Sequence, residues 1–240
     1  MTLPLSVVLR TKAKRVARAA GLEVSSLGSS FTGLQRRLLS EVDLVVDVGA
    51  NTGQYAALMR SLGYRGPIVS FEPSRQAYET LARKAADDPH WDVRHCALGR
   101  VAGRSVLHLS ANSASNSMLP IQPAHLAAAP YSQVIGREEI RVSTADEELS
   151  DIDGQAVWLK MDVQGAELDV LAGASATCGR ARVVQSEMLL GELYEDQADY
   201  LKICSVLRER GLRLHHLERG FQDKSSGLVL AVDGLFVRSA

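Results

Sequence analysis

The stretch VVDVGANTGQY, residues 45–55, constrains the fold of this chain more than any other feature. Its first residues are β-branched and apolar without polar alternation, which is typical of a strand buried on both faces of a sheet. Gly49 and Gly53 then form a glycine-rich turn, and helical spacing follows. A buried strand that runs through such a turn into a helix indicates an α/β fold with a parallel sheet.

The same alternation of strand and helix recurs to the end of the chain. Further strands are predicted at 66–73, 91–99, 156–163 and 180–188, and helices at 52–63, 74–88, 166–174 and 196–211. Two last strands, at 212–218 and 228–238, are joined by a polar turn and indicate an antiparallel hairpin. Together these elements predict a doubly wound, mostly parallel, seven-stranded α/β sheet with an antiparallel edge hairpin.

Two regions depart from this alternation and suggest the domain organisation. Residues 1–40 carry seven Lys/Arg against one acidic residue, and their periodicity predicts a basic helix at 5–20. Residues 103–145 hold two apolar-alternating pieces around a Ser/Asn/Ala/Pro-rich loop at about 111–135, a length more typical of a functional loop than of a connection. We therefore predict a basic N-terminal helical extension (1–40) and one α/β domain (41–240) with an insertion at about 103–145.

Composition limits the classes of partner and compartment. The formal net charge is −1, so no overall field favours nucleic acid. Three widely spaced cysteines form no CxxC or Cys/His cluster, which argues against a disulfide framework or a structural zinc site. With no export signal and no spanning segment, the expected location is cytoplasmic. The basic helix at 5–20 has two interpretations, a helix that closes the acceptor pocket or a peripheral contact with the inner membrane face.

The glycine turn and a following carboxylate indicate a nucleoside cofactor. GANTG lacks the third glycine of a dinucleotide turn, and no Lys follows Gly53 as a phosphate-binding loop requires. Glu72 lies nineteen residues after Gly53, at the end of the second strand, where a carboxylate can accept hydrogen bonds from ribose hydroxyls. HCALG, at the end of the third strand, offers small apolar groups for adenine. These features suit S-adenosylmethionine (SAM).

Six motifs in this order resemble the FkbM family of SAM-dependent methyltransferases, from about residue 42 to 238. They are VVDVGANTGQY, FEPSRQAYETL, HCALG, WLKMDVQGAELDVLAGA, VQSEM with LYED, and DGLFVR. The resemblance implies a class I, Rossmann-like methyltransferase fold. It also implies methyl transfer to a hydroxyl, typically of a sugar in a glycolipid, a polysaccharide or a macrolide-type natural product.

The resemblance also implies which residues hold SAM. The matching positions lie in the turn and at strand ends: Asp47, Gly49, Asn51, Thr52, Gly53, Glu72, Cys96, Ala97 and Asp162. The turn residues would surround the methionine part, Glu72 would hold the ribose, and Cys96 and Ala97 would lie near adenine. Asp162 would lie beside the reactive methyl. Gln164 departs from the family, because many members have Glu at that position.

Methylation of an alcohol needs a group that takes up or stabilises the charge of its proton. Asp162 and Glu187 end neighbouring strands, so their carboxylates could face one pocket as a base or as ligands of a divalent metal. Lys160 points to the same face as Asp162 and could orient it or bind substrate. We predict Asp162, Lys160 and Glu187 as catalytic residues. A structural ion pair of Lys160 with Asp162, and a helix-capping role for Glu187, remain open alternatives.

The predicted function is thus SAM-dependent O-methyl transfer to a small-molecule or glycolipid acceptor, with the loop at 111–135 in acceptor recognition. Two other classes of function remain open. One is an NAD-dependent oxidoreductase on a similar fold, and the other is a non-catalytic SAM-binding protein. His125, within the loop, is expected to be a solvated loop histidine.

Overall fold

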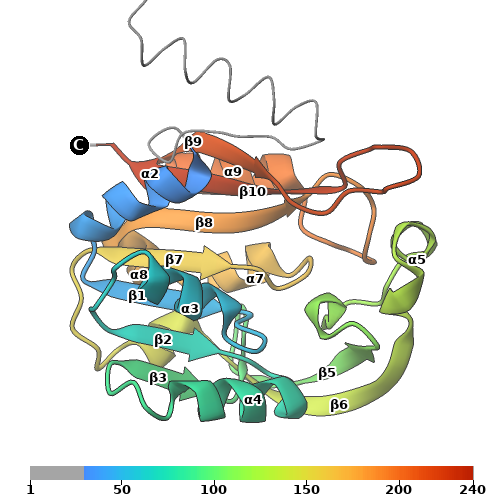
Figure 1. The fold of residues 1–240 in the computed structure, drawn as a ribbon, viewed down its shortest axis with the longest axis horizontal. Coiled ribbons are helices and arrows are strands. Elements are labelled where there is room, and N and C mark those ends of the chain that lie inside the picture. Colours follow the sequence, from blue (N-terminus) through green and yellow to red (C-terminus); the bar gives the residue numbers. More distant parts are fainter. Residues whose placement is uncertain (1–29, 240) are drawn as a thin grey trace, which may run out of the picture.

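The computed structural model describes residues 30–239, and its centre is a seven-stranded sheet (Figure 1). The strands are β1 (Leu44–Val48), β2 (Ile68–Phe71), β3 (Trp91–Arg94), β7 (Val157–Met161), β8 (Ala181–Leu189), β9 (Leu212–Arg219) and β10 (Ala231–Arg238). Their order is β3-β2-β1-β7-β8-β10-β9. The first five are parallel, and β10 is antiparallel to both β8 and β9. The predicted doubly wound sheet with an antiparallel edge hairpin is confirmed, whereas the helix predicted at 5–20 lies outside the described residues.

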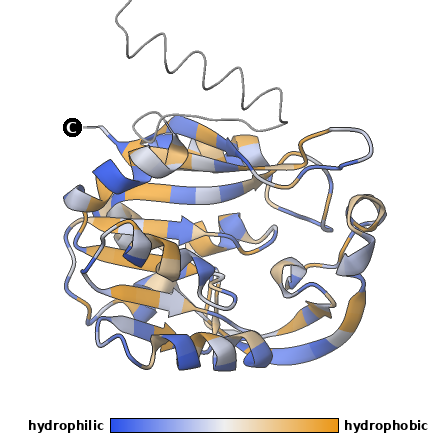
Figure 2. Ribbon diagram, viewed as in Figure 1, coloured by the Kyte–Doolittle hydropathy of each residue, from blue (hydrophilic) through white to orange (hydrophobic). Residues whose placement is uncertain are grey.

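Helices cover both faces of the sheet, so every residue of its central strands β1 and β7 is buried. One face carries α2 (Phe31–Leu38), α3 (Gln54–Ser61) and α4 (Arg75–Ala85), and the other carries α7 (Glu167–Ala172), α8 (Ser175–Arg180) and α9 (Tyr200–Glu209). Along β1, Val45 packs into the core of the first face, while Leu44 and Val46 pack into the core of the second. Successive side chains of a strand point to opposite faces, so an unbroken apolar run serves both cores. Figure 2 shows the resulting band of hydrophobic residues along the strands.

Helices α2 and α8, both in the described part of the chain, were not predicted from the sequence. At the start of α2, the Ser30 hydroxyl accepts a hydrogen bond from the backbone N–H of Gly33, so a Ser/Gly-rich stretch that resembles a loop contains a helix cap. At α8, Asp146 accepts hydrogen bonds from the backbone N–H groups of Ala176 and Thr177. Because Asp146 lies far from α8 in sequence, local periodicity does not reveal this cap.

The third predicted strand, 91–99, divides between two sheets. Its first part is β3, and its last part is β4 (Ala97–Leu98), which pairs with β6 (Val134–Ser143). Strand β6 also pairs antiparallel with β5 (Gly103–Ser110), so the second sheet has the order β4-β6-β5. The strand pair predicted within 103–145 is confirmed. It lies beyond the carboxyl ends of β1, β2 and β7 (Figure 1).

The loop predicted at 111–135 contains structure of its own. It holds α5 (Pro123–Ala128) and two single-turn helices, Ser113–Ser115 and Pro130–Ser132; two more short helices, Leu39–Glu41 and α6 (Ala145–Glu148), lie outside it. Ile121 forms a β-bridge with Tyr194, and the backbone N–H of Gln122 donates to the carbonyl of Leu193 at 2.9 Å. These bonds attach the inserted segment (residues 103–145) to the chain that follows β8.

Across residues 30–239, no helix combines the length and the apolar character that crossing a membrane requires.

Candidate active site

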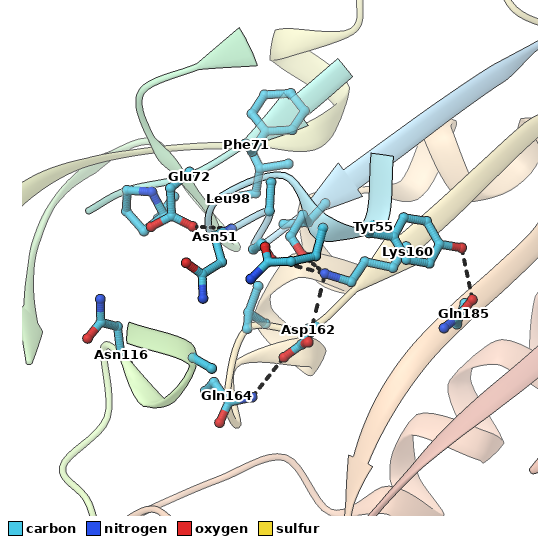
Figure 3. A pocket seen from close by; sticks show the side chains of 18 of the residues that line it. Asn51, Tyr55, Phe71, Glu72, Leu98, Asn116, Lys160, Asp162, Gln164 and Gln185 are labelled. Atoms are coloured by element: carbon cyan, nitrogen blue, oxygen red, sulfur yellow. Dashed lines mark hydrogen bonds and ion pairs between the residues drawn. The ribbon is translucent and has the colours of Figure 1, made fainter. Parts of the chain in front are cut away.

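A cavity of about 460 Å³, the main cavity, opens at the carboxyl ends of β1, β2 and β7 (Figure 3). Ligands of doubly wound folds bind at this edge of the sheet, and the volume falls in the range of small-molecule sites. Seven of the residues predicted from the sequence line it: Gly49, Asn51, Glu72, Cys96, Ala97, Lys160 and Asp162. Helix α2 adds Phe31, Thr32 and Gln35, which the sequence did not suggest as site residues.

The glycine turn brings the end of β1 against the end of β7. Gly49 has φ +74°, and a Cβ atom there would lie 1.9 Å from the carbonyl oxygen of Asp162, so only glycine fits. Gly53 has φ +82° and precedes α3, where a Cβ would lie 2.8 Å from the ring of Trp91. Thr52 and Gly53 are absent from the cavity lining, and Asp47 is buried behind it. A cofactor contact by these three residues therefore stays a prediction.

Glu72 forms a polar wall of the main cavity beside an apolar surface. Its carboxylate accepts hydrogen bonds from the backbone N–H groups of Asn51 at 2.8 Å and Ser74 at 2.9 Å. Burial raises the pKa of Glu72 to about 7, although both bonds act to lower it. Next to it lie the side chains of Phe71 and Leu98. A carboxylate beside an apolar surface fits a nucleoside, whose ribose hydroxyls donate hydrogen bonds and whose base is apolar on both faces.

Lys160 lies between two carboxylates at the floor of the main cavity. Its Nζ is 3.1 Å from Oδ1 of Asp47 and 3.8 Å from Oδ2 of Asp162, and it donates to the carbonyl of Gly49 at 2.9 Å. Burial alone would lower the pKa of Lys160, but the charges of Asp47 and Asp162 outweigh burial and raise it. Lys160 is thus a buried ammonium in an ion pair with Asp162. Its shorter ion pair is with Asp47, and a role in orienting Asp162 stays a prediction.

Gln164 joins the two predicted carboxylates. Its Nε2 donates to Oδ1 of Asp162 at 2.7 Å and to Oε2 of Glu187 at 2.6 Å, and its Oε1 accepts from the Tyr194 hydroxyl at 2.6 Å. Figure 3 shows Asp162 held between Lys160 and Gln164. Burial, followed by the charge of Asp162, raises the pKa of Glu187 well above its usual range. The structure therefore brings Asp162 and Glu187 together, and the Glu187 side chain faces Gln164 rather than a helix end.

The backbone of Gln164 has φ +55°, a left-handed conformation that costs a non-glycine residue free energy. Such conformations gather at functional sites. The sequence identified Gln164 only as a departure from the family, and Tyr194 only as part of the LYED motif, with no role for it in the site. Among residues 30–239 there is no group of three or more His, Cys, Asp or Glu side chains that could hold a metal ion. Asp162 and Glu187 as metal ligands stay a prediction.

A second cavity, of about 190 Å³, meets the main cavity at Ala114, Asp162 and Gln164, which line both. The inserted segment contributes Asn112, Ser115, His125, Ala129, Tyr131 and Ser132 to its wall. The later part of the chain contributes Glu187, Leu189, Leu193, Phe221 and Ala231. The expectation of a solvated His125 is wrong, because its side chain is only 4% exposed. Its ring lies against Tyr194 and Phe221, both distant in sequence. Loop composition alone gave no signal for this packing.

Comparison with known proteins gives a family and several relatives. The model of the methyltransferase FkbM domain matches residues 47–214. The 2-O-methyltransferase NoeI of Sinorhizobium fredii is 26% identical over 178 residues, which cover 71% of this chain and 73% of that protein. Methyltransferase sdnD of Sordaria araneosa is 29% identical over 54% of this chain, and the match spans 59% of its own length, less than two thirds.

Solved structures with a similar fold are distant in sequence. Fibrillarin of Aeropyrum pernix, with natively bound SAM, is 12% identical with a TM-score of 0.46, over 81% of this chain and 66% of that one. Precorrin-6y C5,15-methyltransferase of Geobacter metallireducens is 13% identical with a TM-score of 0.47, over 87% of each chain.

Proposed function

This chain belongs to the FkbM family of SAM-dependent methyltransferases, and from that premise we propose that it methylates a hydroxyl oxygen of a sugar in a glycolipid or a related natural product. The family sets aside the interpretation as an NAD-dependent oxidoreductase. The similarity to NoeI, whose name states 2-O-methyl transfer, supports an oxygen acceptor. The observation that carries the proposal is the Asp162 carboxylate at the junction of the two cavities.

In this proposal the main cavity holds SAM, which supplies a reactive methyl group on a sulfonium when bound. Glu72 accepts hydrogen bonds from the ribose hydroxyls, and the apolar surface of Phe71, Cys96 and Ala97 contacts adenine. Gly49 and Asn51 lie beside the methionine part. The sulfonium is already reactive, so the main task of the chain is to place the acceptor hydroxyl opposite the leaving sulfur.

Asp162 is the group that we propose takes the proton of the acceptor hydroxyl. Lys160 approaches Oδ2 of Asp162 and Gln164 donates to Oδ1, so both carboxylate oxygens are held in place. Lys160 is then a positioning residue. Burial raises the pKa of Glu187, which favours its neutral, protonated form and so limits the negative charge beside Asp162. A carboxylate so fixed at the junction is what argues for an enzyme over a non-catalytic SAM-binding protein.

The test combines ligand titration with one pair of variants. Calorimetric titration with SAM, S-adenosylhomocysteine and NAD should show micromolar binding of the two adenosyl ligands and none of NAD. With labelled SAM and a panel of glycosides, glycolipids and phenols, Asp162→Asn should lose at least about 100-fold in turnover while its affinity for S-adenosylhomocysteine stays nearly unchanged. Asp169→Asn, which alters an exposed carboxylate paired with Arg100, is the matched control and should keep full activity.

Full activity of Asp162→Asn would remove Asp162 from the mechanism. Binding of NAD alone would overturn the methyltransferase proposal altogether. Transfer to phenols but to none of the glycosides would keep the enzyme class and exclude the sugar acceptor.

A further inference from the structure

The second cavity contains a buried histidine with an unpaired ring nitrogen. His125 lines this cavity from α5, and Nδ1 has no hydrogen-bond partner within residues 30–239. Its other nitrogen, Nε2, lies 3.4 Å from the hydroxyl of Ser115. A buried polar atom without a partner is costly, so native structures pair almost all such atoms. Because His125 belongs to the wall of the second cavity, its unpaired nitrogen points to a ligand there that pairs with it.

The ring of His125 is held in one place by its neighbours. Its centroid lies 5.1 Å from that of Tyr194 in an edge-on contact and 5.5 Å from that of Phe221. The Tyr194 hydroxyl in turn donates to Gln164, which binds both Asp162 and Glu187. A chain of direct contacts therefore sets the position of His125 relative to the proposed base.

We infer that the second cavity is the acceptor site, and that Nδ1 of His125 binds a second hydroxyl of the acceptor, distinct from the one that is methylated. This inference rests on the proposed function, because it assigns the acceptor to the far side of Asp162 from the cofactor. His125 is then a specificity-determining residue that the inserted segment contributes.

The shape of the second cavity supports this assignment. When the cofactor fills the main cavity and an acceptor hydroxyl lies at Asp162, the rest of the acceptor must occupy the space lined by Glu187 and the inserted segment. About 190 Å³ is less than a drug-sized ligand fills, so the cavity encloses a single ring rather than a whole glycolipid. Tyr131, which is 63% exposed, also lines it, so the cavity reaches the surface and the remainder of an acceptor can leave there.

The hydrogen bonds around His125 favour a hydroxyl over a charged group. Burial lowers the pKa of His125, so the ring is neutral at pH 7, with one nitrogen as donor and the other as acceptor. The Ser115 hydroxyl can donate to Nε2 or accept from it, because it also contacts the Ser132 hydroxyl at 3.0 Å. Nδ1 is therefore free to act in either sense, and a hydroxyl is the partner that suits both.

Two substitutions at His125 separate its two nitrogens. His125→Asn retains a polar atom near the position of Nδ1, whereas His125→Gln retains one near Nε2 and loses the other. His108→Gln is the matched control, because His108 of β5 lines neither cavity. The probes are methyl glucoside, galactoside, mannoside and fucoside, each with its monodeoxy analogues, at saturating labelled SAM.

We expect at least one parent glycoside to be methylated, with kcat/KM about 10- to 100-fold lower in His125→Gln, mainly through KM, and a smaller loss in His125→Asn. With the unaltered protein, kcat/KM for one deoxy analogue should be lower than for its parent glycoside by a similar factor. His125→Gln should not lower kcat/KM for that analogue further. Affinity for S-adenosylhomocysteine should be the same in all variants. His108→Gln should behave as the unaltered protein.

Three outcomes would overturn the inference. Equal losses in His125→Gln for a parent glycoside and all its deoxy analogues would make His125 structural only. An unaltered protein that methylates every deoxy analogue as fast as its parent would exclude a second bound hydroxyl, even if neither variant folds. Binding of S-adenosylhomocysteine without transfer to any glycoside would exclude a sugar as the acceptor in this cavity. Failure to bind S-adenosylhomocysteine would overturn the proposed function itself.

Discussion

Gln164 shows how one residue can organise the candidate site. A neutral amide can donate to Asp162 and Glu187 and accept from Tyr194 at the same time, with three distances of 2.6 to 2.7 Å. A third carboxyl group in its place would add another acid to Asp162 and Glu187, and like charges close together raise the pKa of each. In this chain the amide thus allows two acids to lie close together without a cation between them.

We predict that Glu72 makes the affinity for the cofactor depend on pH. Burial raises its pKa to about 7, and the ionised carboxylate is the better acceptor for ribose hydroxyls. The ionised fraction falls as the pH drops below that value, so affinity should fall with it. We expect S-adenosylhomocysteine to bind about 30-fold more weakly at pH 5.5 than at pH 8.5, as measured by calorimetry.

The matched variant for this prediction is Glu72→Gln, which should bind more weakly and without dependence on pH over the same range. An equal pH dependence in both proteins would assign the titration to another group and would leave Glu72 without a role in binding.

At the scale of elements, the buried strands and the acids at their ends could be predicted from the sequence, because both follow from local pattern. Unbroken apolar runs identified β1, β2, β7 and β8, and parallel strands bring their carboxyl ends to one edge. This reasoning placed Asp162 beside Glu187. It also found Glu72, whose distance from the glycine turn is fixed by one helix and one strand.

Two features that the sequence missed, helix α8 and the burial of His125, depend on contacts between distant residues. Helix α8 has its N-terminal cap on Asp146, and His125 is buried by Tyr194 and Phe221. The second cavity is formed by the inserted segment, Glu187 and the end of the chain together. No local periodicity carries such information, so polar loop composition favoured a solvated segment.

The close approach of β1 and β7 predicts a large effect of Gly49→Ala. The added Cβ would lie 1.9 Å from the carbonyl oxygen of Asp162, so the two strand ends must separate. We expect the free energy of unfolding in urea to fall by at least about 3 kcal/mol. Gly63→Ala is the control, because Gly63 also has positive φ but a Cβ there meets nothing within 4 Å. It should cost only about 1–2 kcal/mol, and equal losses would show that the strand contact is unimportant.

The inserted segment predicts a second effect at this scale. Replacing residues 120–131 by a short Gly/Ser linker removes α5 and His125, but it leaves the seven-stranded sheet intact. We expect kcat/KM for the best acceptor to fall at least about 100-fold, because the acceptor loses its wall. The melting temperature should fall by less than about 5 °C, because few core residues are lost. Loss of stability and activity in proportion would instead make the segment structural.

At the scale of the whole molecule, the main cavity draws on residues from Phe31 to Asp233. Helix α2 closes one side of it, and the side chain of Gln35 bonds Gln185 of β8 at 3.0 Å. The cavity thus depends on nearly the full length of the described chain. Residues 1–29, which precede the described part of the chain, carry five of the Lys and Arg residues and one acid.

This arrangement predicts different results for two N-terminal truncations. A chain that begins at residue 30 should bind S-adenosylhomocysteine as tightly as the full chain, because it keeps every lining residue within 30–239, the part of the chain that the structure describes. A chain that begins at residue 39 loses α2, so we expect calorimetry to show at least about 10-fold weaker binding.

Vesicle flotation of the same chains tests the basic residues before residue 30, each of which adds about 1 kcal/mol of attraction to an anionic surface at low salt. The full chain should float with phosphatidylserine vesicles and the chain from residue 30 should not. Flotation of both would place the membrane contact in the domain, and flotation of neither would leave residues 5–20 to the other predicted role, closing the acceptor pocket.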